Sequence, residues 1–314
     1  MKKKVALICG ISGQDGGYLA NLLLEKDYEV WGTSRDAEGT SFSNLEGLGI
    51  KERVKLLSMQ PEDYKSVWVA LRKSQPNELY FLAGQTSVGL SFELPAETIQ
   101  SILLGTLNIL EACRSLENQV RIYNAGSSEC FGDTKGVAAT ELTPFEPRSP
   151  YAIAKASAFW LVNNYREAYG LFACTGILFN HESTFRPSRF VTQKIISTAR
   201  RIANGSGEKL HLGRLDISRD WGWSPEYVEA MWLMLQQEHP DDFVIATGEL
   251  NSLEDFVNAA FSQHGLSWKE HVINDENFMR PTDIEVSFGN PSKAKEILNW
   301  SAKYKMHDVV KMMM

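Results

Sequence analysis

The sequence contains no long apolar run. Its longest runs, such as Val5–Cys9 and Gly176–Phe179, are short and interrupted, whereas a membrane-spanning helix requires about 18 or more consecutive apolar residues. The basic start Lys2–Lys4 followed by Val5–Cys9 resembles a signal peptide, but this run breaks at Gly10 and is too short for a hydrophobic signal core. We therefore interpret Val5–Cys9 as a strand and expect no association with a membrane.

An excess of basic charge is also absent. The chain has 32 Lys and Arg residues against 39 Asp and Glu residues, a formal net charge of −7. Proteins that bind the nucleic-acid backbone need a basic face, so we expect no nucleic-acid partner. A small basic pocket for one phosphorylated ligand is still compatible with this charge.

Cysteine is scarce and dispersed. The four cysteines, Cys9, Cys113, Cys130 and Cys174, lie far apart in apolar segments and form no C-x-x-C pair. This usage is typical of buried, reduced thiols and favours a reducing, cytoplasmic compartment. The histidines have no His, Asp or Glu partners at ligand spacing, and we predict no metal site.

The hydrophobic fraction of 43% over 314 residues is enough for a sizeable core, in one large domain or two joined lobes. Strand-like runs alternate with helical patterns through the first two-thirds of the chain. The alternation predicts an α/β fold with a Rossmann-type, doubly wound parallel sheet. The expected strands are 5–9, 29–33, 54–58, 79–82 and 120–125, and the expected helices are 16–26, 64–73 and 98–114.

The alternation becomes irregular after Leu178, where helices are predicted over 190–204 and 226–237. No Pro-, Gly- or Ser-rich linker divides the chain, so a second lobe would be woven into the first. We expect residues 1–178 to form mainly a cofactor-binding Rossmann domain. Residues 179–314 are expected to form mainly a smaller, interwoven substrate lobe.

A glycine-rich segment, Gly10-Ile-Ser-Gly13-Gln-Asp-Gly16, lies between the first predicted strand and the first helix. Such glycines allow a tight turn and let the backbone approach a pyrophosphate at the positive N-terminal end of the helix. The strand before it and the helix after it favour a dinucleotide-binding loop over a plain strand–helix turn.

The end of the second predicted strand indicates which dinucleotide. A carboxylate there binds a ribose 2′-hydroxyl, whereas an arginine accommodates a 2′-phosphate. Ser34 stands where the acid is expected and Arg35 follows it, which favours NADP. Asp36 is an alternative acid and keeps NAD open.

A second pattern is Tyr151-Ala-Ile-Ala-Lys155, preceded by Ser127. Tyrosine and lysine four residues apart lie on one helix face, so the ammonium of Lys155 is expected to lower the pKa of Tyr151 and make the phenol an acid–base group. The hydroxyl of Ser127 can hold the reacting oxygen. With the glycine loop, these residues predict hydride transfer between a nicotinamide and a secondary alcohol.

Together these motifs resemble the extended short-chain dehydrogenase/reductase superfamily, and the chain is similar to the GDP-mannose 4,6-dehydratase family over essentially its whole length. The matching stretches are Gly10–Gly16, Phe81–Gln85, Ser87–Gly89, Ser91–Pro95, Pro147–Lys155, Gly176–Ser183, Phe190–Lys194, Arg219–Gly222, Tyr227–Gln236, Arg280–Thr282 and Asn290–Lys295. The chain departs from the family pattern at Gln60, at the single Arg35 in place of two arginines, and at Ser127 in place of threonine.

The resemblance implies roles for individual residues. It implies catalytic roles for Ser127, Glu129, Tyr151 and Lys155. The implied NADP contacts are Gly10, Ser12, Gly13, Gln14, Asp15, Gly16, Arg35, Leu82, Ala83, Gly84, Gln85, Thr86, Tyr151, Lys155, His181 and Arg186. The implied GDP-sugar contacts are Ser87, Asn180, Lys194, Arg219 and Arg280.

The reaction that the resemblance implies is that of a lyase, the conversion of GDP-D-mannose to GDP-4-dehydro-6-deoxy-D-mannose with loss of water. A GDP-sugar 4-reductase or epimerase on the same scaffold is the alternative, but neither needs a carboxylate such as Glu129 for elimination. A non-catalytic NADP sensor would normally lose Tyr151 or Lys155, and both are present. The resemblance also implies a homodimer or homotetramer.

Overall fold

A seven-stranded parallel sheet forms the centre of the molecule. The computed structural model describes residues 3–279 and 281–314. The sheet has the order β11-β6-β5-β4-β1-β2-β3. Its strands are β1 (Val5–Cys9), β2 (Glu29–Ser34), β3 (Lys55–Ser58), β4 (Glu78–Phe81), β5 (Arg121–Ala125), β6 (Ala173–Leu178) and β11 (Phe243–Ile245).

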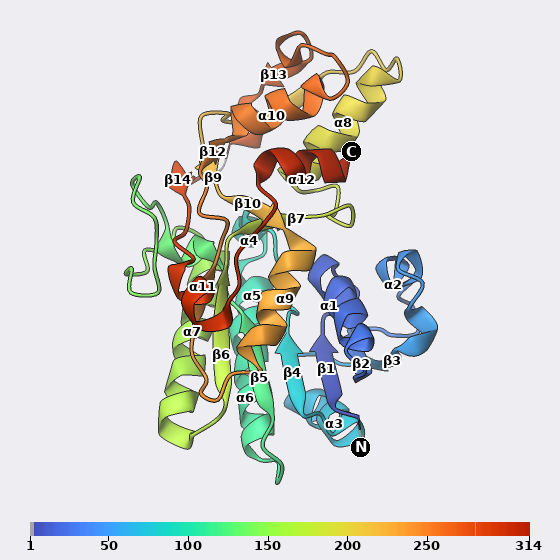
Figure 1. Cartoon of the computed structure of the whole chain (residues 1–314), viewed down its shortest axis with the longest axis vertical. Helices are drawn as coiled ribbons and strands as arrows, with labels where there is room; N and C mark the ends of the chain where they lie inside the picture. Colours follow the sequence, from blue (N-terminus) through green and yellow to red (C-terminus); the bar gives the residue numbers. More distant parts are fainter. Residues whose placement is uncertain (1–2, 280) are drawn as a thin grey trace.

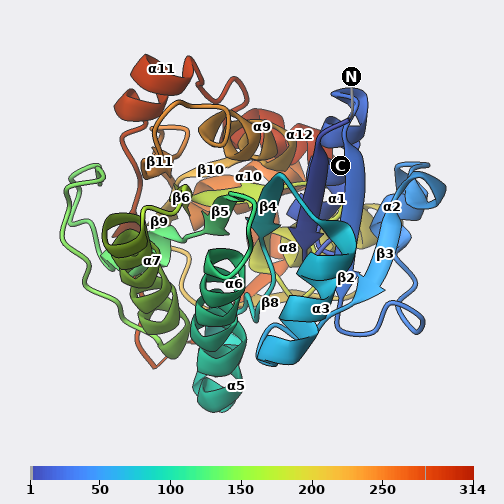
Figure 2. The same cartoon turned by 90° about the horizontal axis from the view of Figure 1, so that it is seen from below.

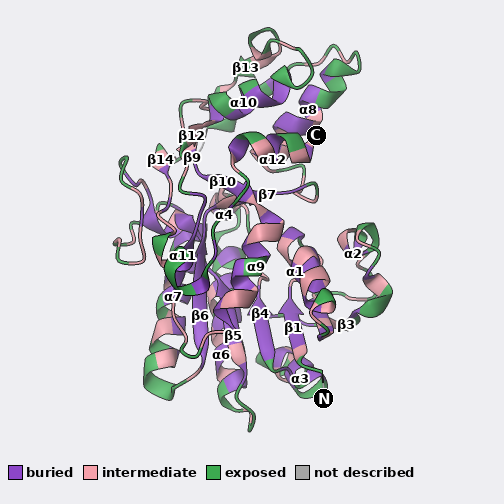
Figure 3. Ribbon diagram, in the orientation of Figure 1, coloured by how far each residue is buried: buried purple, intermediate pink, exposed green. Residues whose placement is uncertain are grey.

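Helices cover both faces of this sheet (Figures 1 and 2). Parallel strands covered on both faces are apolar throughout, and the central strands β1, β4, β5 and β6 are accordingly buried in Figure 3, whereas the edge strand β3 is not. On one face, α1 (Gln14–Glu25) and α9 (Ser224–Met234) pack on β1, β4 and β6. On the other face lie α3 (Tyr64–Ser74), α6 (Gly105–Arg114) and α7 (Pro150–Tyr169). The predicted doubly wound fold is confirmed.

The long helix expected over 98–114 is divided in the structure. It consists of α5 (Pro95–Ile99), a π-helical turn η2 (Gln100–Leu104) and α6. Pro95 stands at the first position of α5, where a missing N–H costs nothing, so the helical path begins earlier than the apolar spacing alone suggested. A short helix, α4 (Val88–Glu93), precedes it.

A smaller lobe lies above the carboxyl ends of the strands (Figure 1). Its core is formed by apolar residues of three helices together with short strands and Trp221. The helices are α8 (Val191–Ala203), α10 (Leu253–Ser262) and α12 (Met306–Met313). The strands are β7 (Asn180–Glu182), β8 (Leu210–Leu212), β9 (Ser218–Arg219), β10 (Trp221–Trp223), β12 (Asn251–Ser252), β13 (Val272–Asn274) and β14 (Val286–Ser287).

The chain after Leu178 returns to the large sheet. β11 pairs with β6, α9 packs beside α1, and α11 (Ser292–Leu298) packs against β11. The two lobes therefore share the C-terminal half of the sequence. Within the part of the chain that the structure describes, no helix is both long and apolar enough to span a lipid bilayer.

Candidate active site

The strand order predicts a ligand-binding crevice above the carboxyl ends of β1 and β4. β1 pairs with β2 on one side and with β4 on the other, so the direction of strand addition reverses between β1 and β4. Ligands of open α/β sheets bind at such a switch point. The loop Gly10–Gly16 follows β1 and the loop 82–87 follows β4, so both predicted cofactor segments border this crevice.

The glycine loop is shaped as a cradle for a diphosphate. Gly10 has a φ of +89°, and a Cβ there would lie 3.0 Å from the backbone of Ala83. A Cβ on Gly16 would lie 2.5 Å from the carbonyl oxygen of Gly10, so only glycine permits this close packing. Gly13 is the N-cap residue of α1, and no side chain caps that helix end. The residues present therefore fit a dinucleotide, which would receive hydrogen bonds from the free N–H groups of this helix end.

After β2, Arg35 is exposed, whereas the side chain of Asp36 is hydrogen-bonded to its own turn. The side chain of Arg35 is 73% exposed, and its guanidinium lies 3.8 Å from the carboxylate of Glu97. Asp36 instead folds onto its own turn, where its Oδ1 accepts the N–H groups of Glu38 at 3.1 Å and Gly39 at 2.9 Å. An arginine is thus available for a phosphate at this position, whereas the alternative acid already serves the backbone.

The loop after β4 is held by side chains of its own. The amide of Gln85 donates to the carbonyl of Ser87 at 2.8 Å and to the hydroxyl of Thr98 at 3.2 Å. Ser87 caps α4, because its Oγ accepts the N–H of Leu90 at 3.2 Å. The backbone of Leu82–Thr86 is therefore fixed at the crevice, and the hydroxyl of Ser87 is engaged in the cap.

The four predicted catalytic side chains lie together at the end of β5. Ser127 follows that strand, its Oγ accepts the N–H of Glu129 at 3.3 Å, and its hydroxyl lies close enough to Tyr151 to lower the pKa of the phenol. Tyr151 stands in the first turn of α7, which Ser149 caps by accepting the N–H of Ala152 at 3.1 Å. Lys155 is one turn further along, with its Nζ 5.9 Å from the centre of the Tyr151 ring. Glu129 lies in the helical turn η3 (Ser128–Phe131), close enough for its charge to act on Tyr151.

The prediction that Lys155 lowers the pKa of Tyr151 is wrong for the chain by itself. Burial raises the pKa of Tyr151, and the hydrogen bond from Ser127 offsets only part of that rise. The ammonium of Lys155 donates to the carbonyl oxygen of Ala125 at 2.8 Å, and burial lowers its pKa to about 8. The i, i+4 spacing does put both residues on one helix face, but the lysine reaches toward the strand end.

His181 and Arg186 lie near the crevice and are paired with acids. The Nε2 of His181 lies 3.0 Å from the carboxylate of Asp15, which joins β7 to the first turn of α1. The Nε of Arg186 lies 3.0 Å from the buried carboxylate of Glu182. Burial raises the pKa of Glu182, and the charge of Arg186 counters part of that rise. Their predicted contacts with a cofactor stay predictions.

Three of the predicted sugar-nucleotide residues, Asn180, Lys194 and Arg219, lie in the smaller lobe, whereas Ser87 lies in the loop after β4. Lys194 donates to the carbonyl of His211 at 2.7 Å and its ammonium lies 3.7 Å from the centre of the Phe278 ring. These residues border a cavity of about 340 Å³. Asn180 opens β7, which pairs with β10. Arg280 lies outside the described residues.

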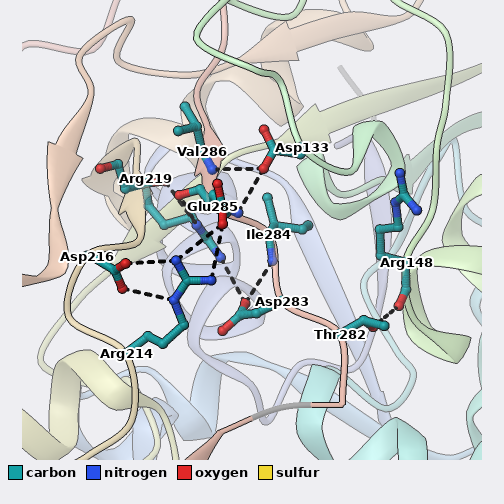
Figure 4. A network of polar contacts seen from close by, with 11 residues as sticks. Asp133, Arg148, Arg214, Asp216, Arg219, Thr282, Asp283, Ile284, Glu285 and Val286 are labelled. Carbon is teal, nitrogen blue, oxygen red and sulfur yellow. Dashed lines mark hydrogen bonds and ion pairs between the residues drawn. The ribbon is translucent and has the colours of Figure 1, made fainter. Parts of the chain in front are cut away.

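Arg219 is more deeply buried than we expect for a side chain that binds a diphosphate. Its guanidinium donates to the carbonyl of Ser218 at 3.0 Å and to Asp283 at 3.3 Å. Figure 4 shows Arg219 within a network in which segment 282–286 joins the smaller lobe to Asp133 and Arg148 of the larger one. A contact between Arg219 and a diphosphate stays a prediction.

One residue bordering the crevice was not expected from the sequence. Arg189 donates to the hydroxyl of Thr86 at 3.4 Å, and its guanidinium lies 5.0 Å from the ring of Phe190. It thereby links the loop after β4 to the segment before α8. A further arginine three residues after Arg186 was the one available signal, and nothing in its spacing indicated the partner.

Comparison with known proteins agrees with this geometry. The family model described as GDP-mannose 4,6 dehydratase matches residues 7–313. The chain belongs to the GDP-mannose 4,6-dehydratase family. This confirms the resemblance on which the individual residue roles depend.

Relatives of this GDP-mannose 4,6-dehydratase family member match along nearly the whole chain. GDP-mannose 4,6 dehydratase 1 of Arabidopsis thaliana is 46% identical over 321 residues, covering 99% of this chain and 89% of its own. The Homo sapiens GDP-mannose 4,6 dehydratase is 41% identical, covering 99% of this chain and 90% of its own.

Solved structures share the fold of the family. The Thermus thermophilus UDP-glucose 4-epimerase, solved in complex with NAD, aligns with a TM-score of 0.86 at 25% identity. The alignment covers 98% of this chain and 97% of the epimerase. The whole two-lobed arrangement is therefore common to both proteins.

Proposed function

We propose that the chain is a lyase that converts GDP-D-mannose to GDP-4-dehydro-6-deoxy-D-mannose and water. The observation that carries this proposal is the position of Glu129 in the turn beside Ser127, within electrostatic reach of Tyr151. Of the protein's own side chains, oxidation at C4 needs only the serine, tyrosine and lysine, with a nicotinamide as hydride acceptor. Elimination across C5 and C6 needs an additional acid–base group, and Glu129 supplies a carboxylate at the same site.

The cofactor is a nicotinamide dinucleotide, which the cradle of Gly10–Gly16 fits. When bound, it supplies a hydride acceptor for C4 and a hydride donor for C6, and its oxidised ring adds positive charge to the site. The UDP-glucose 4-epimerase that shares the fold was solved with NAD. We propose NADP for this chain, because Arg35 ends β2 and the carboxylate of Asp36 is turned onto its own backbone.

Tyr151 serves the first half of the reaction. Its phenolate takes the proton of the C4 hydroxyl as the hydride leaves C4, and Ser127 holds the same oxygen by a hydrogen bond. The ammonium of Lys155, anchored on the carbonyl of Ala125, contributes positive charge on the same helix face. Because burial raises the pKa of Tyr151, the phenolate depends on the positive charge gathered around it.

Glu129 serves the second half. The 4-keto group acidifies the hydrogen on C5, and the carboxylate of Glu129 removes this proton. The resulting carboxylic acid then protonates the C6 hydroxyl, which leaves as water. Glu129 would then take a proton from solvent and deliver it to C5, and Tyr151 would release to solvent the proton that it took from O4. A bound dinucleotide would supply the hydride for C6 and would end in the form in which it began. Lys194, Asn180, Ser87, Arg219 and Arg280 are proposed to hold the GDP-sugar.

The deciding experiment compares Glu129→Gln with the matched exposed variant Glu117→Gln. The amide is nearly isosteric but takes no proton, and general acid–base catalysis contributes about 10²–10⁴-fold. Turnover of GDP-mannose should fall by that factor in Glu129→Gln while GDP-mannose binding persists, and Glu117→Gln should behave as the unmodified chain.

Product made in deuterated water should carry deuterium at C5 and be 18 mass units lighter than the substrate before labelling is counted. A product without C5 deuterium, or full turnover by Glu129→Gln, would contradict the dehydratase proposal and favour a GDP-sugar 4-reductase or epimerase.

Cofactor choice has its own test. A charge-assisted hydrogen bond contributes about 1.5–3 kcal/mol, so NADP should bind about ten- to a hundred-fold more tightly than NAD. Arg35→Ala should abolish that ratio by weakening NADP alone. Equal affinities in the unmodified chain would assign the end of β2 to NAD.

Two further proposals concern the setting of the enzyme. The four cysteines are buried free thiols, which supports a reducing, cytoplasmic location. A homodimer or homotetramer is proposed from the family resemblance, and sedimentation velocity tests it.

A further inference from the structure

His181 is surrounded by hydrogen-bond acceptors on both sides of its ring. Its Nδ1 lies 2.7 Å from the carbonyl oxygen of Phe179, and its Nε2 lies 3.0 Å from Oδ2 of Asp15. A neutral imidazole has one N–H, whereas the imidazolium has two. Only the charged form therefore satisfies both contacts, and His181 is 8% exposed, so water cannot replace either partner.

Asp15 is the partner of this imidazolium and lies in the first turn of α1. Its other oxygen, Oδ1, accepts the hydroxyl of Ser224 at 2.8 Å and the amide of Gln14 at 3.1 Å. Ser224 begins α9. Burial alone would raise the pKa of Asp15, but the charge of His181 and these hydrogen bonds outweigh burial, and the pKa is lowered.

Among the described residues, the groups that touch the ring itself supply no second counterion for Asp15, although the ammonium of Lys155 also attracts Asp15. Tyr227 of α9 stacks on His181 with ring centres 4.6 Å apart. Glu182, the next residue of β7, is bound by Thr192 at 2.8 Å and paired with Arg186. The charge of Arg186 disfavours the imidazolium, and burial disfavours it more, yet Asp15 raises the pKa of His181 overall. β10, which pairs with β7, contributes Trp221–Trp223 and no titratable group.

The position of Asp15 creates an electrostatic conflict. The free N–H groups of α1 are the proposed site of a dinucleotide diphosphate, and a carboxylate in the same helical turn would repel that anion. We propose that His181 is a positioning residue that neutralises Asp15 and, through this ion pair, locks the phosphate-binding end of α1 to β7 and α9. The proposal rests on the proposed function only in assuming that a dinucleotide binds at α1.

This arrangement differs from one in which Asp15 and His181 each contact the cofactor. As an ion pair, the two residues are coupled: loss of His181 leaves the charge of Asp15 exposed to the diphosphate, whereas loss of both removes the repulsion. Hydrogen bonds to charged groups contribute enough that removing one changes affinity by about ten- to a hundred-fold.

The test is a fluorescence titration of NADPH with the full chain and with Asp15→Asn, His181→Gln and the double variant. His181→Gln should weaken binding about ten- to a hundred-fold, Asp15→Asn should weaken it less, and the double variant should bind more tightly than His181→Gln. His264→Gln, at an exposed histidine, is the matched control and should bind normally. A double variant weaker than both single variants would overturn the proposal, because independent contacts are lost additively.

A pH series gives a second readout. The pKa of His181 is raised above its ordinary 6.5, so the imidazolium and its contribution are present at pH 6.5 and are lost as the pH rises through the raised value. As the pH rises through the pKa of His181, the NADPH affinity of the unmodified chain should fall more than that of the double variant. An identical pH dependence in both proteins would overturn the proposal. No sugar is turned over in these titrations, so their outcome is separate from that of the GDP-mannose assignment.

Discussion

Two buried charged groups lie at opposite ends of the sheet and differ in the number of their hydrogen-bond partners. At the amino end of β4, the carboxylate of Glu78 is 1% exposed and accepts hydrogen bonds from four side chains. These donors are Lys4, Tyr28, Tyr80 and Gln236. At the carboxyl end of β5, the ammonium of Lys155 is 6% exposed and donates to the carbonyl of Ala125.

The difference separates a structural charge from a reactive one. A buried charge with a full set of partners holds its surroundings in place, and removing it leaves those partners unpaired. A buried ammonium with few partners is disfavoured, and burial accordingly lowers the pKa of Lys155 to about 8. Perturbed groups of this kind gather at catalytic sites, which is where the carboxyl ends of the strands bring Lys155, Tyr151 and Ser127 together.

The largest expected effect on stability comes from the amino end. Glu78→Ala would leave Lys4, Tyr28 and Tyr80 without their common acceptor, and breaking a buried charge cluster costs about 3–5 kcal/mol. Urea denaturation should show this loss, while turnover per folded molecule stays normal. A loss of turnover with unchanged stability would reverse the roles assigned to the two ends.

Lys155→Met should change the stability of the protein in the opposite direction. Burial lowers the pKa of Lys155 from 10.5 to about 8, and each unit corresponds to about 1.4 kcal/mol; the lost hydrogen bond to Ala125 offsets part of this. The variant should be about 1–3 kcal/mol more stable below pH 8 and should lose its turnover. Because the native lysine releases its proton before the unfolded one, stability of the unmodified chain rises between about pH 8 and 10.5.

The stability advantage of Lys155→Met over the unmodified chain should therefore shrink across that range. Chemical denaturation at pH 7 and pH 9.5 checks this, with Lys51→Met at a partly exposed lysine as the control. An advantage that is equal at both pH values would mean that Lys155 is not a destabilised cation.

The smallest expected effects on stability come from two variants that each remove one hydroxyl group. Tyr80→Phe removes one hydrogen bond to Glu78 and should cost about 1 kcal/mol of stability with normal turnover. Tyr151→Phe should change stability by less than that and reduce turnover by about 10²–10⁴-fold. Measuring both variants by urea denaturation and by product formation sharpens the contrast, since equal effects on stability would remove it.

Local pattern was sufficient for the first strand and helix of the larger lobe. The apolar run 5–9 and the spacing of Tyr18, Leu19, Leu22 and Leu23 predicted β1 and α1 because both depend on neighbours in the sequence. The contact of Lys155 with Ala125 spans 30 residues, and the pairing of Asp15 with His181 spans 166. Such partners follow from how the strands are ordered, which periodicity does not contain, so the sequence placed the site residues together without giving their contacts.

The smaller lobe was harder for the same reason. Its strands β9, β12 and β14 have two residues each, too few for an alternating pattern to be recognised. Arg219 was expected to contact the GDP-sugar because it matches the family pattern, but its surroundings are set by segment 282–286, which reaches it from more than 60 residues away. Recognition of the family supplied the candidate residues, and the packing of distant segments supplied their geometry.

The late return of the chain to the sheet has a consequence for biosynthesis. A nascent chain that has emerged only to Leu178 has β6 as its last strand, with no partner on its outer edge, and the face of α1 that α9 will cover is bare. An unpaired edge beside an apolar surface is a template for association with other chains. β6 gains its outer partner only when Phe243–Ile245 has left the ribosome, so a stall between residues 178 and 243 exposes the chain to aggregation for as long as it lasts.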